Sequence, residues 1–428
     1  MSHTTSSINP QVPPHLPSRL TISLWDFSWY TMTTEGEPFA DLDRTFAEAV
    51  ERGYNTVRLC GMPVLLFTDD GPRGGTLELD RLGGEVGQRT RWYTCTGGAR
   101  LDGIAHLLAL FRAARKHDCY VILSSWEYQQ SFSFLAEPTL YDALRAVPVG
   151  DRAMTIAKSM HRLIDHLKAH QLDDCIAYVE VHNEVEWTMM ASDRPAGQDP
   201  WQAVAPMQPP AIAYLRKRHP EILITTCFAS FQLYRQYLHP ENGQVAHFHL
   251  YEKDVLQDLD RKVDLRGAGE FPSEFLASML RDDAPLFEDY RLPPDDRWKL
   301  GGNPNGERLM YYHDWIDPVK YDLYLYEHWP EYRRLTLEGI TLRLEAQADW
   351  ARRLSIPCVV GEGFLGYTPY ESEFEGGPVG KAVAEHAIAE IVRLGFWGSV
   401  TCSNAAPHHP MWTDVAWQRR MNDLIRRS

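Results

Sequence analysis

The sequence predicts a (β/α)8 barrel of the α/β class, on three observations. Eight short runs rich in β-branched residues alternate with longer helical patterns, which is typical of a parallel α/β architecture. No Gly-x-Gly-x-x-Gly segment follows the first run, and the competing fold, an open doubly wound sheet, rarely needs eight such units. The length of 428 residues suits a single barrel whose loops carry insertions.

The predicted elements follow from these patterns in chain order. The strands are expected at residues 20–25, 56–60, 120–124, 176–181, 222–227, 245–249, 358–361 and 399–402. The helices are expected at 40–52, 101–117, 151–170, 208–218, 331–354, 379–394 and 413–426, with Asp151 as the N-cap of the third helix. A Gly-rich loop is expected at 61–99.

Two segments fall outside this alternation. Residues 1–18 are polar and carry four prolines, so we expect a flexible N-terminal segment before a single (β/α)8 domain at 19–428. Residues 252–328 are acidic, aromatic and Pro-rich, with no clear period. They are interpreted as a long insertion after the sixth strand, near the barrel mouth. Such long loops in compact domains are usually functional.

Composition narrows the class of protein. The net charge is −15 and no Lys/Arg run stands out, which argues against a nucleic-acid partner. The N-terminus lacks the pattern of a signal peptide, and no apolar run is long enough to span a bilayer. The seven cysteines are odd in number and include no Cys-x-x-Cys, which favours buried free thiols in a reducing compartment. We therefore expect a cytoplasmic protein without a membrane partner, and homo-oligomerisation stays open.

Two glutamates follow predicted strands at the mouth of the barrel, where such barrels place their catalytic residues. The fourth strand leads into His182-Asn183-Glu184, and the seventh ends in Gly361-Glu362. Cleavage of a glycosidic bond needs one protonated and one ionised carboxyl group, about 5–5.5 Å apart in retaining enzymes. Strands four and seven lie across a barrel, so the two groups can face each other. We expect mutual repulsion to raise the pKa of the protonated member. Either carboxylate alone would more often cap a helix or bind water; the pair favours catalysis.

Five segments in chain order resemble glycoside hydrolase clan A, and most closely the family 5 cellulase-like proteins. Asn183-Glu184 resembles the acid/base signature, and Glu362 resembles the nucleophile. Asn55-x-x-Arg58 resembles the segment whose arginine lies beneath the nucleophile. His249-x-Tyr251 resembles the motif whose tyrosine hydrogen-bonds it, and the run 178–181 also fits. The resemblance covers roughly 19–426 without the insertion. It implies that Glu184 is the acid/base and that no cofactor is needed.

Physical chemistry assigns matching roles to the supporting residues. Arg58 would keep Glu362 ionised by charge pairing, although a purely structural ion pair is as good an explanation. Asn183 would hold the sugar 2-hydroxyl. Aromatic rings near strand ends can stack on sugar C–H faces, and polar groups there can bind hydroxyls. The candidates for substrate contact are Trp25, Asp26, Trp126, Glu127, His182, Glu186, Trp187, Phe364, Tyr367, Asn404 and Trp412, the last as the stacking tryptophan expected near strand eight.

Histidines near strand ends raise a second possibility, a metal-dependent hydrolase. His247 and His249 alternate on one strand, and His182 and the pair His408-His409 follow others. Metal-dependent barrels of this kind usually begin with His-x-His on strand one, where this chain has Ser-Leu-Trp-Asp, so we expect no metal. The sequence thus predicts a retaining β-glycosidase with a carbohydrate substrate, exo-acting if the insertion closes one end of the cleft. A catalytically silent sugar-binding barrel is the other alternative.

Overall fold

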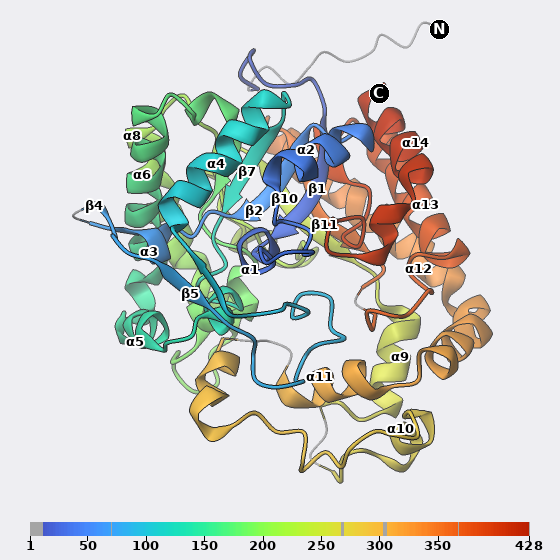
Figure 1. Cartoon of the computed structure of the whole chain (residues 1–428). Coiled ribbons are helices and arrows are strands. Elements are labelled where there is room, and N and C mark those ends of the chain that lie inside the picture. Colours follow the sequence, from blue (N-terminus) through green and yellow to red (C-terminus); the bar gives the residue numbers. More distant parts are fainter. Residues whose placement is uncertain (1–11, 70, 267–268, 303–305, 367, 428) are drawn as a thin grey trace, which may run out of the picture.

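Eight parallel strands form a nearly closed barrel in the computed structural model, which describes residues 12–427 except 70, 267–268, 303–305 and 367 (Figure 1). The strands are β1 (Leu20–Asp26), β2 (Thr56–Cys60), β7 (Tyr120–Ser124), β8 (Ile176–Glu180), β9 (Ile224–Thr225), β10 (Ala246–Tyr251), β11 (Cys358–Phe364) and β12 (Gly398–Val400). They pair in the order β9-β8-β7-β2-β1-β12-β11-β10, and a bridge between Phe228 and Phe248 joins the two ends. The (β/α)8 fold predicted from the sequence is therefore confirmed.

The helices cover the outside of the barrel. They are α2 (Leu42–Glu51), α4 (Gly103–Lys116), α6 (Arg152–Ala169), α8 (Gln208–Arg218), α12 (Pro318–Leu354), α13 (Pro378–Leu394) and α14 (Val415–Arg426). Side-chain caps define the starts of α2 and α4, because Asp41 accepts from Arg44 N at 3.1 Å and Asp102 from Ala105 N at 2.9 Å. Asp151 is the N-cap residue of α6, as predicted, although its side chain makes no capping hydrogen bond.

The helix expected at 331–354 is 37 residues long and begins at Pro318. Asp317 caps it by accepting from the backbone N–H groups of Val319 and Lys320. Pro330 lies inside the helix, so this proline does not mark the helix start that the sequence pattern indicated.

Short elements fill the remaining connections. The predicted Gly-rich loop holds α3 (Pro63–Leu66) and the strands β3 (Phe67–Thr68), β4 (Gly71–Pro72), β5 (Leu77–Leu79) and β6 (Ala99–Leu101). Further short helices are α1 (Ser28–Thr31), α5 (Thr139–Ala146) and α7 (Pro200–Val204). None of these was predicted, because each is too short to produce a hydrophobic period.

Residues 252–328 contain more regular structure than their sequence indicates. They form α9 (Asp254–Lys262), α10 (Glu274–Met279), a 3₁₀ helix at Pro294–Leu300, α11 (Gly306–Trp315) and the first residues of α12. The buried side of α9 carries Val255, Leu256 and Leu259. In Figure 1 the helices α9, α10 and α11 lie at the end of the barrel away from both chain termini. This segment therefore lies beyond the carboxyl ends of the strands.

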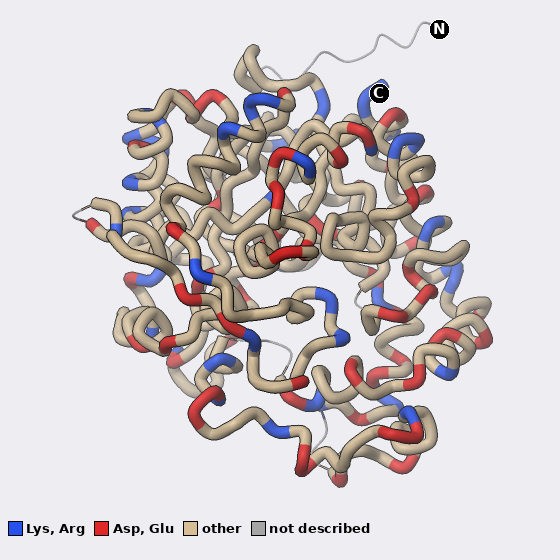
Figure 2. Tube along the Cα trace, in the orientation of Figure 1, with Lys and Arg blue, Asp and Glu red and all other residues tan. Residues whose placement is uncertain are grey.

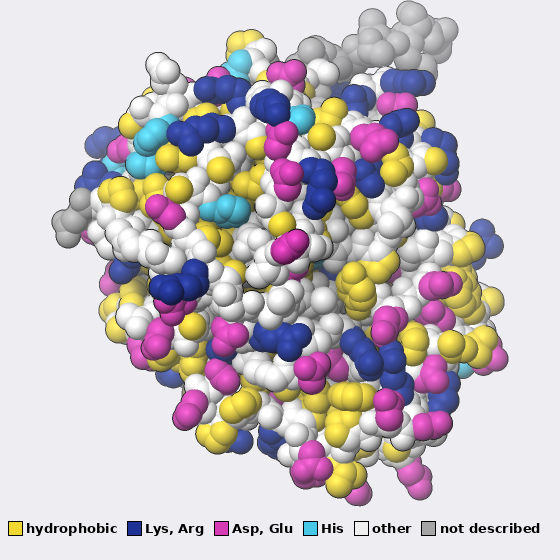
Figure 3. Space-filling model, viewed as in Figure 1, with side chains coloured by type: hydrophobic (Ala, Val, Ile, Leu, Met, Phe, Trp, Pro, Cys, Tyr) yellow, Lys and Arg dark blue, Asp and Glu magenta, His cyan; other side chains and the backbone are white. Residues whose placement is uncertain are grey.

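The opposite end of the barrel is covered by the described part of the N-terminal segment, residues 12–18. Leu16 is buried, and Trp397 Nε1 donates to Pro17 O at 3.0 Å. All seven cysteines are buried and unpaired, as the sequence predicted. Figures 2 and 3 show Lys and Arg interspersed with Asp and Glu over the viewed face. In the described part of the chain, no helix has the length and apolar character to cross a membrane.

Candidate active site

Glu362, on β11, is held by two donors from different strands. Arg58 Nη1 on β2 donates to its Oε1 at 2.8 Å, and the Tyr251 hydroxyl on β10 donates to its Oε2 at 2.9 Å. The same hydroxyl lies 2.7 Å from Ser403 Oγ, which accepts from Gly363 N at 2.9 Å. Glu362 is 5% exposed, so both carboxylate oxygens are fixed in a nearly dry environment. Ser403 lies in the loop after β12 and was not predicted.

Arg58 is fully buried and pairs with a second carboxylate below Glu362. Its Nε and Nη2 donate to the two oxygens of Glu180 on β8, at 2.9 and 2.8 Å, and Nη2 also donates to Asn183 Oδ1 at 2.6 Å. Burial raises the pKa of Glu180, but the charge and hydrogen bonds of Arg58, together with His247 and His249, outweigh it and lower that pKa to about 2. Glu180 is thus a permanent anion that keeps the guanidinium in place.

Glu184 lies just after β8 in the left-handed region of backbone conformation, with φ of +41°. His249 Nδ1, from β10, donates to its Oε1 at 2.8 Å, and Gln129 Nε2 donates to its Oε2 at 3.3 Å. Gln129 Oε1 accepts from Asn183 Nδ2 at 2.9 Å, so this glutamine couples Asn183 to Glu184. Gln129 was not predicted, although its place five residues after β7 puts it at the same rim.

The two glutamates face one another. One carboxylate oxygen of Glu184, one of Glu362 and a ring nitrogen of His249 lie within 4.8 Å of one another. The sequence predicted a raised pKa for Glu184, and the structure gives a lowered one. Burial raises the pKa, but the hydrogen bond and charge of His249 outweigh it, and the pKa of Glu184 is lowered. The correction arises because His249 supplies a donor directly to the carboxylate.

A glycine on β11 makes room for a further histidine inside the barrel. A Cβ on Gly361 would lie 2.0 Å from His247 Nε2, so a side chain at 361 would collide with the ring. His247 Nδ1 lies 2.6 Å from the Tyr178 hydroxyl, and burial lowers the pKa of His247 well below its ordinary value. Tyr178 and His247 therefore form a neutral layer beneath the charged one.

Four predicted polar contacts lie at the rim but bind other protein groups. Glu127 accepts from Leu65 N at 2.7 Å and from Ser125 Oγ at 2.6 Å. Glu186 accepts from Ala229 N at 2.8 Å, and His182 Nε2 accepts from Tyr128 N at 3.1 Å. Asp26 accepts from Ser28 N at 2.6 Å. These bonds hold loops of the rim in place. The second carboxylate oxygens of Asp26 and Glu186, and Nδ2 of Asn404, are buried without a hydrogen-bond partner in the described chain.

The predicted aromatic contacts divide into two groups. Trp126 lies against Arg58, with the guanidinium carbon 4.7 Å from the ring centroid, and Trp187 is 53% exposed just beyond Glu184. Trp25 packs on Phe39 and Phe46, 5.2 and 4.6 Å between centroids, so it belongs to the layer between barrel and helices.

Two further aromatic candidates are equally enclosed. Trp412 stacks on Tyr54 at 5.8 Å and donates to Glu48 at 2.9 Å, so its assignment as the stacking tryptophan is corrected to packing against α2. Phe364 is 1% exposed. Tyr367 lies outside the described residues.

Three groups of side chains have spacings compatible with a metal ion, and each is already used in hydrogen bonds. Within the described chain they are Cys227, His247 and His249; His161, Asp165 and His219; and Glu184, His249 and Glu362. In the first group His247 bonds to Tyr178 and His249 to Glu184. In the second, His161 and His219 lie 2.9 Å apart, and Lys168 is bonded to His219. A metal would have to displace these partners.

Two segments cover the mouth above this site. Gly87 N and Arg89 N, in the loop at 80–98, donate to the carboxylate of buried Asp314 on α11 at 2.6 and 2.7 Å. A Cβ on Gly302 would lie 2.8 Å from Gln129 O, so the chain after the 3₁₀ helix runs directly over the Gln129 segment. In Figure 1 the loop at 80–98 runs between the barrel and α11.

A cavity of about 660 Å³ lies beside the site, between α9 and α11. Its lining includes Lys253, Leu256, Phe287, Arg308 and His313. Lys253 lies two residues after the end of β10, and its charge is among the effects that lower the pKa of Glu184.

Comparisons with known proteins agree with this architecture. A family model described as sugar-binding cellulase-like matches residues 22–237 and 289–426; the stretch between them includes β10 and the first part of the insertion. A comparison with curated protein sequences gave no match. A putative glycoside hydrolase from Parabacteroides distasonis ATCC 8503 is 19% identical with a TM-score of 0.67, over 95% of this chain and 93% of that one.

Two mannan-degrading enzymes are more distant in structure. The endo-1,4-β-D-mannanase from Thermotoga petrophila RKU-1 is 12% identical with a TM-score of 0.47, over 89% of this chain and 87% of its own. The exo-β-1,4-mannosidase Op5Man5 from Opitutaceae bacterium strain TAV5 is 15% identical with a TM-score of 0.47, over 95% and 59%. Such identities show the fold alone. The family model, however, matches most of the chain, and the protein therefore belongs to the sugar-binding cellulase-like family of clan A barrels.

Proposed function

We propose that the protein is a retaining β-glycosidase in which Glu362 is the nucleophile and Glu184 the acid/base. The proposal rests on two buried carboxylates, each of which places one oxygen within 4.8 Å of an oxygen of the other. This spacing suits direct attack by one carboxylate and leaves no room for the water that inverting enzymes place between their carboxyl groups, about 6.5–9.5 Å apart.

In the first step, Glu362 attacks the anomeric carbon while Glu184 gives a proton to the departing glycosidic oxygen. A covalent glycosyl ester forms and the alcohol leaves. Arg58 and Tyr251 donate to Glu362, at 2.8 and 2.9 Å, and fix its position for attack.

Glu184 and His249 are hydrogen-bonded at 2.8 Å, and in the empty site this contact outweighs the effect of burial and lowers the pKa of Glu184. A bound sugar excludes water, and a drier environment raises the pKa of a buried carboxyl group. The nearby charge of Glu362 acts in the same direction. Binding of substrate thus makes Glu184 an acid although its pKa is lowered in the empty site.

In the second step, Glu184 accepts a proton from water, and the hydroxide attacks the anomeric carbon and frees Glu362. Hydrogen bonds to Arg58 and Gln129 hold the side-chain amide of Asn183 near the rim. There it suits the sugar 2-hydroxyl, a contact that strengthens in the transition state.

Exo action is supported by the two segments that cover the mouth. The loop at 80–98 is tied to α11 through Asp314, and the chain at 301–302 runs over Gln129. A long polymer would have to displace these contacts to pass through the site. We therefore propose removal of a terminal sugar from small β-linked oligosaccharides.

A screen of aryl β-glycosides with purified protein tests the proposal. Glu362→Gln should abolish turnover of whichever glycoside is cleaved, while the protein keeps its unfolding temperature. The matched control is Glu373→Gln, which alters an exposed carboxyl group in the loop between β11 and α13. Turnover that survives Glu362→Gln would overturn the assignment of the nucleophile. Release of internal fragments from long oligosaccharides would overturn exo action.

The alternative function is sugar binding without catalysis. The description of the family as sugar-binding is the reason to test it. A binder would show no turnover of any glycoside, and Glu362→Gln would change sugar affinity only modestly. Loss of activity on exhaustive chelation would instead favour a metal-dependent hydrolase.

A further inference from the structure

Cys227, at the start of the loop after β9, places a thiol beside the histidine that contacts Glu184. Its Sγ lies 3.2 Å from Nε2 of His249, and Nδ1 of the same ring bonds to Glu184 Oε1 at 2.8 Å. Cys227 is 0% exposed and His249 is 1% exposed. The three side chains thus form a buried chain of contacts that ends at the proposed acid/base.

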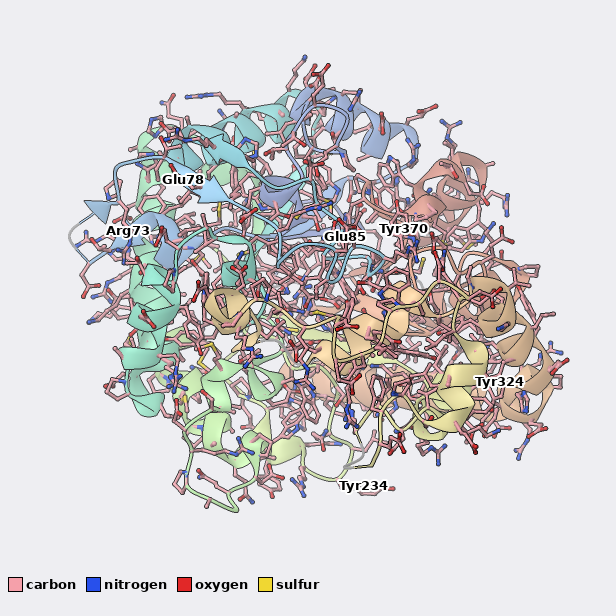
Figure 4. The ribbon with its side chains drawn as sticks, turned by 60° about the horizontal axis from the view of Figure 1, so that its bottom comes forward. Arg73, Glu78, Glu85, Tyr234, Tyr324 and Tyr370 are labelled. Carbon is pink, nitrogen blue, oxygen red and sulfur yellow. The ribbon has the colours of Figure 1, made fainter. Side chains whose placement is uncertain are left out.

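The backbone of Cys227 is bonded to the segment that carries Glu184. Its N–H donates to His182 O at 3.3 Å, and Val185 N donates to Cys227 O at 3.2 Å. The same loop later reaches the edge of the molecule at Tyr234, which is 96% exposed and is labelled in Figure 4. The thiol therefore belongs to the buried, bonded start of this loop and not to its exposed part.

A bridge between their neighbours directs Cys227 and His249 into the barrel. Phe228 pairs with Phe248 of β10, and the Phe248 ring lies 4.9 Å from that of Phe231, in the layer against α12. Side chains alternate along an extended chain, so the adjacent residues Cys227 and His249 point to the interior. The contact between them is thus set by the register of the barrel strands.

The thiol of Cys227 carries its proton. Burial, and after it the charge of Glu180, raise the pKa of Cys227 well above its ordinary value, so this side chain is an S–H donor. Two acceptors lie within reach, Nε2 of His249 at 3.2 Å and the carbonyl oxygen of Phe228 at 3.6 Å. The shorter contact favours donation to the ring nitrogen.

A carboxylate competes with the thiol for this nitrogen. Glu362 Oε1 lies 3.5 Å from Nε2 of His249, and it would need a proton on that nitrogen, whereas the thiol needs its lone pair. A neutral imidazole has one proton, so the two contacts exclude each other. Glu362 Oε1 already accepts from Arg58 at 2.8 Å, and the thiol is the nearer of the two groups. We therefore expect Nε2 to be the unprotonated nitrogen.

The other titratable neighbours of the ring do not choose between its two nitrogens. The rings of His247 and Tyr251 lie 5.6 and 6.5 Å from that of His249, and burial lowers the pKa of His247 well below its ordinary value. The negative charge of Glu180 acts on the ring as a whole. The position of the ring proton is thus decided by the groups that contact the nitrogens directly.

We propose that Cys227 is a positioning residue that donates its S–H to Nε2 of His249 and so keeps the single ring proton on Nδ1, facing Glu184. This inference rests on the proposed glycosidase function and extends it to the control of the acid proton. A ring fixed in this tautomer donates to Glu184 Oε1 and cannot accept a proton at Nδ1. The proton of the acid form of Glu184 therefore stays on the carboxyl group, available to the departing oxygen.

Nuclear magnetic resonance of the full chain labelled with ¹⁵N-histidine tests the assignment without any need for turnover. Long-range ¹⁵N–¹H spectra distinguish protonated from unprotonated ring nitrogens, and signals missing in His249→Gln identify His249. At neutral pH we expect a protonated Nδ1 and an unprotonated Nε2 in the wild type and in Cys227→Ser, which keeps a donor. In Cys227→Ala, Nε2 should gain a proton.

Two results of this measurement would overturn the proposal. One is a protonated Nε2 in the wild type, which decides the matter even if no variant folds. The other is a ring whose protonation is the same in Cys227→Ala as in the wild type. The matched control is Cys119→Ala, which removes a buried thiol just before β7, at the opposite end of the barrel, and should leave the His249 signals unchanged.

Kinetics with two kinds of leaving group separate positioning from packing. Cys227→Ala should lower kcat/KM for glycosides with poor alkyl leaving groups about three- to tenfold, the loss expected for one neutral hydrogen bond. Dinitrophenyl glycosides need no proton from Glu184, so their kcat/KM should fall less than about twofold. Cys227→Ser should restore the alkyl rate. Equal losses for both substrates, or no rescue by serine, would assign Cys227 to packing alone.

The two proposals can fail separately. A protein that cleaves no glycoside but shows the expected ring protonation, lost in Cys227→Ala, would keep the contact of Cys227 with His249 and reject the hydrolase. Cleavage that depends on Glu362 and Glu184, with a ring that does not respond to Cys227→Ala, would keep the hydrolase and reject the positioning role.

Discussion

Replacing Arg58 by methionine separates its structural role from the catalytic role proposed for it. The substitution leaves Glu180 and Glu362 without their buried cation, which is paired to them at 2.8 Å. Removing one partner of a buried pair costs about 3–5 kcal/mol. For a chain of this length, the average unfolding entropy converts this into a loss of about 3–6 °C in unfolding temperature. Loss of the charged hydrogen bond to Glu362 should also lower kcat by about ten- to a hundredfold.

The double variant Arg58→Met/Glu180→Gln decides between the two roles. It removes both members of the lower pair, so much of the lost stability should return. Activity should stay low, because Glu362 still lacks its donor. Calorimetric unfolding and aryl glycoside kinetics on the same samples give both readouts. Arg100→Met is the control, since its ion pair with Glu78 is exposed and surface pairs contribute little. Recovery of activity together with stability would refute a direct role of Arg58 at the nucleophile.

Three further outcomes follow from the same geometry. Glu184→Gln should slow glycosides with poor alkyl leaving groups by about 10²–10⁴-fold, and dinitrophenyl glycosides far less; equal losses would speak against an acid role. Tyr251→Phe should lower kcat by about tenfold, whereas Tyr324→Phe on the outer helix should not; equal rates would remove Tyr251 from the nucleophile's support. Glu180 has a pKa of about 2 in the fold against an ordinary 4.5, so it contributes stability above pH 4.5 that is lost towards pH 2, roughly 3 kcal/mol in all. Denaturation between pH 6 and 3 should show a weaker acid dependence in Glu180→Gln, and an unchanged one would contradict this.

Much of the barrel was predictable because its signals are local. Runs of β-branched residues predicted all eight strands, and apolar periods predicted most helices to within a few residues. The fifth strand is the weakest, with only Ile224–Thr225 in regular pairing. The insertion was not predictable in detail. Its helices α9, α10 and α11 are 9, 6 and 10 residues long, and such lengths produce little periodicity.

The candidate site was predictable only where a strand end marks it. That rule places Glu184 and Glu362 at one mouth, the resemblance to clan A adds Arg58 and Tyr251, and the structure brings all four together. It could not predict which of the neighbouring aromatic side chains face outward. Trp25, for example, packs against Phe46 of α2, away from the mouth.

Groups contributed by loops were even less accessible from the sequence. Gln129 lies outside any strand, and only the folded loop brings it to the mouth. The lowered pKa of Glu184 is of the same kind, since it depends on one ring nitrogen of His249 at 2.8 Å. Distances of this kind are set by loop packing, which spacing along the chain does not encode.

The charges in the site suit a group that must act first as an acid and then as a base. Before attack, Glu362 carries a negative charge near Glu184 and opposes ionisation of that neighbour. In the proposed mechanism, formation of the glycosyl ester would remove this charge, while Arg58 and His249 remain. The local balance would become more positive when Glu184 has given up its proton, which would stabilise its carboxylate as the base that water requires. In this mechanism the change in the pKa of Glu184 would therefore follow from the covalent state of Glu362.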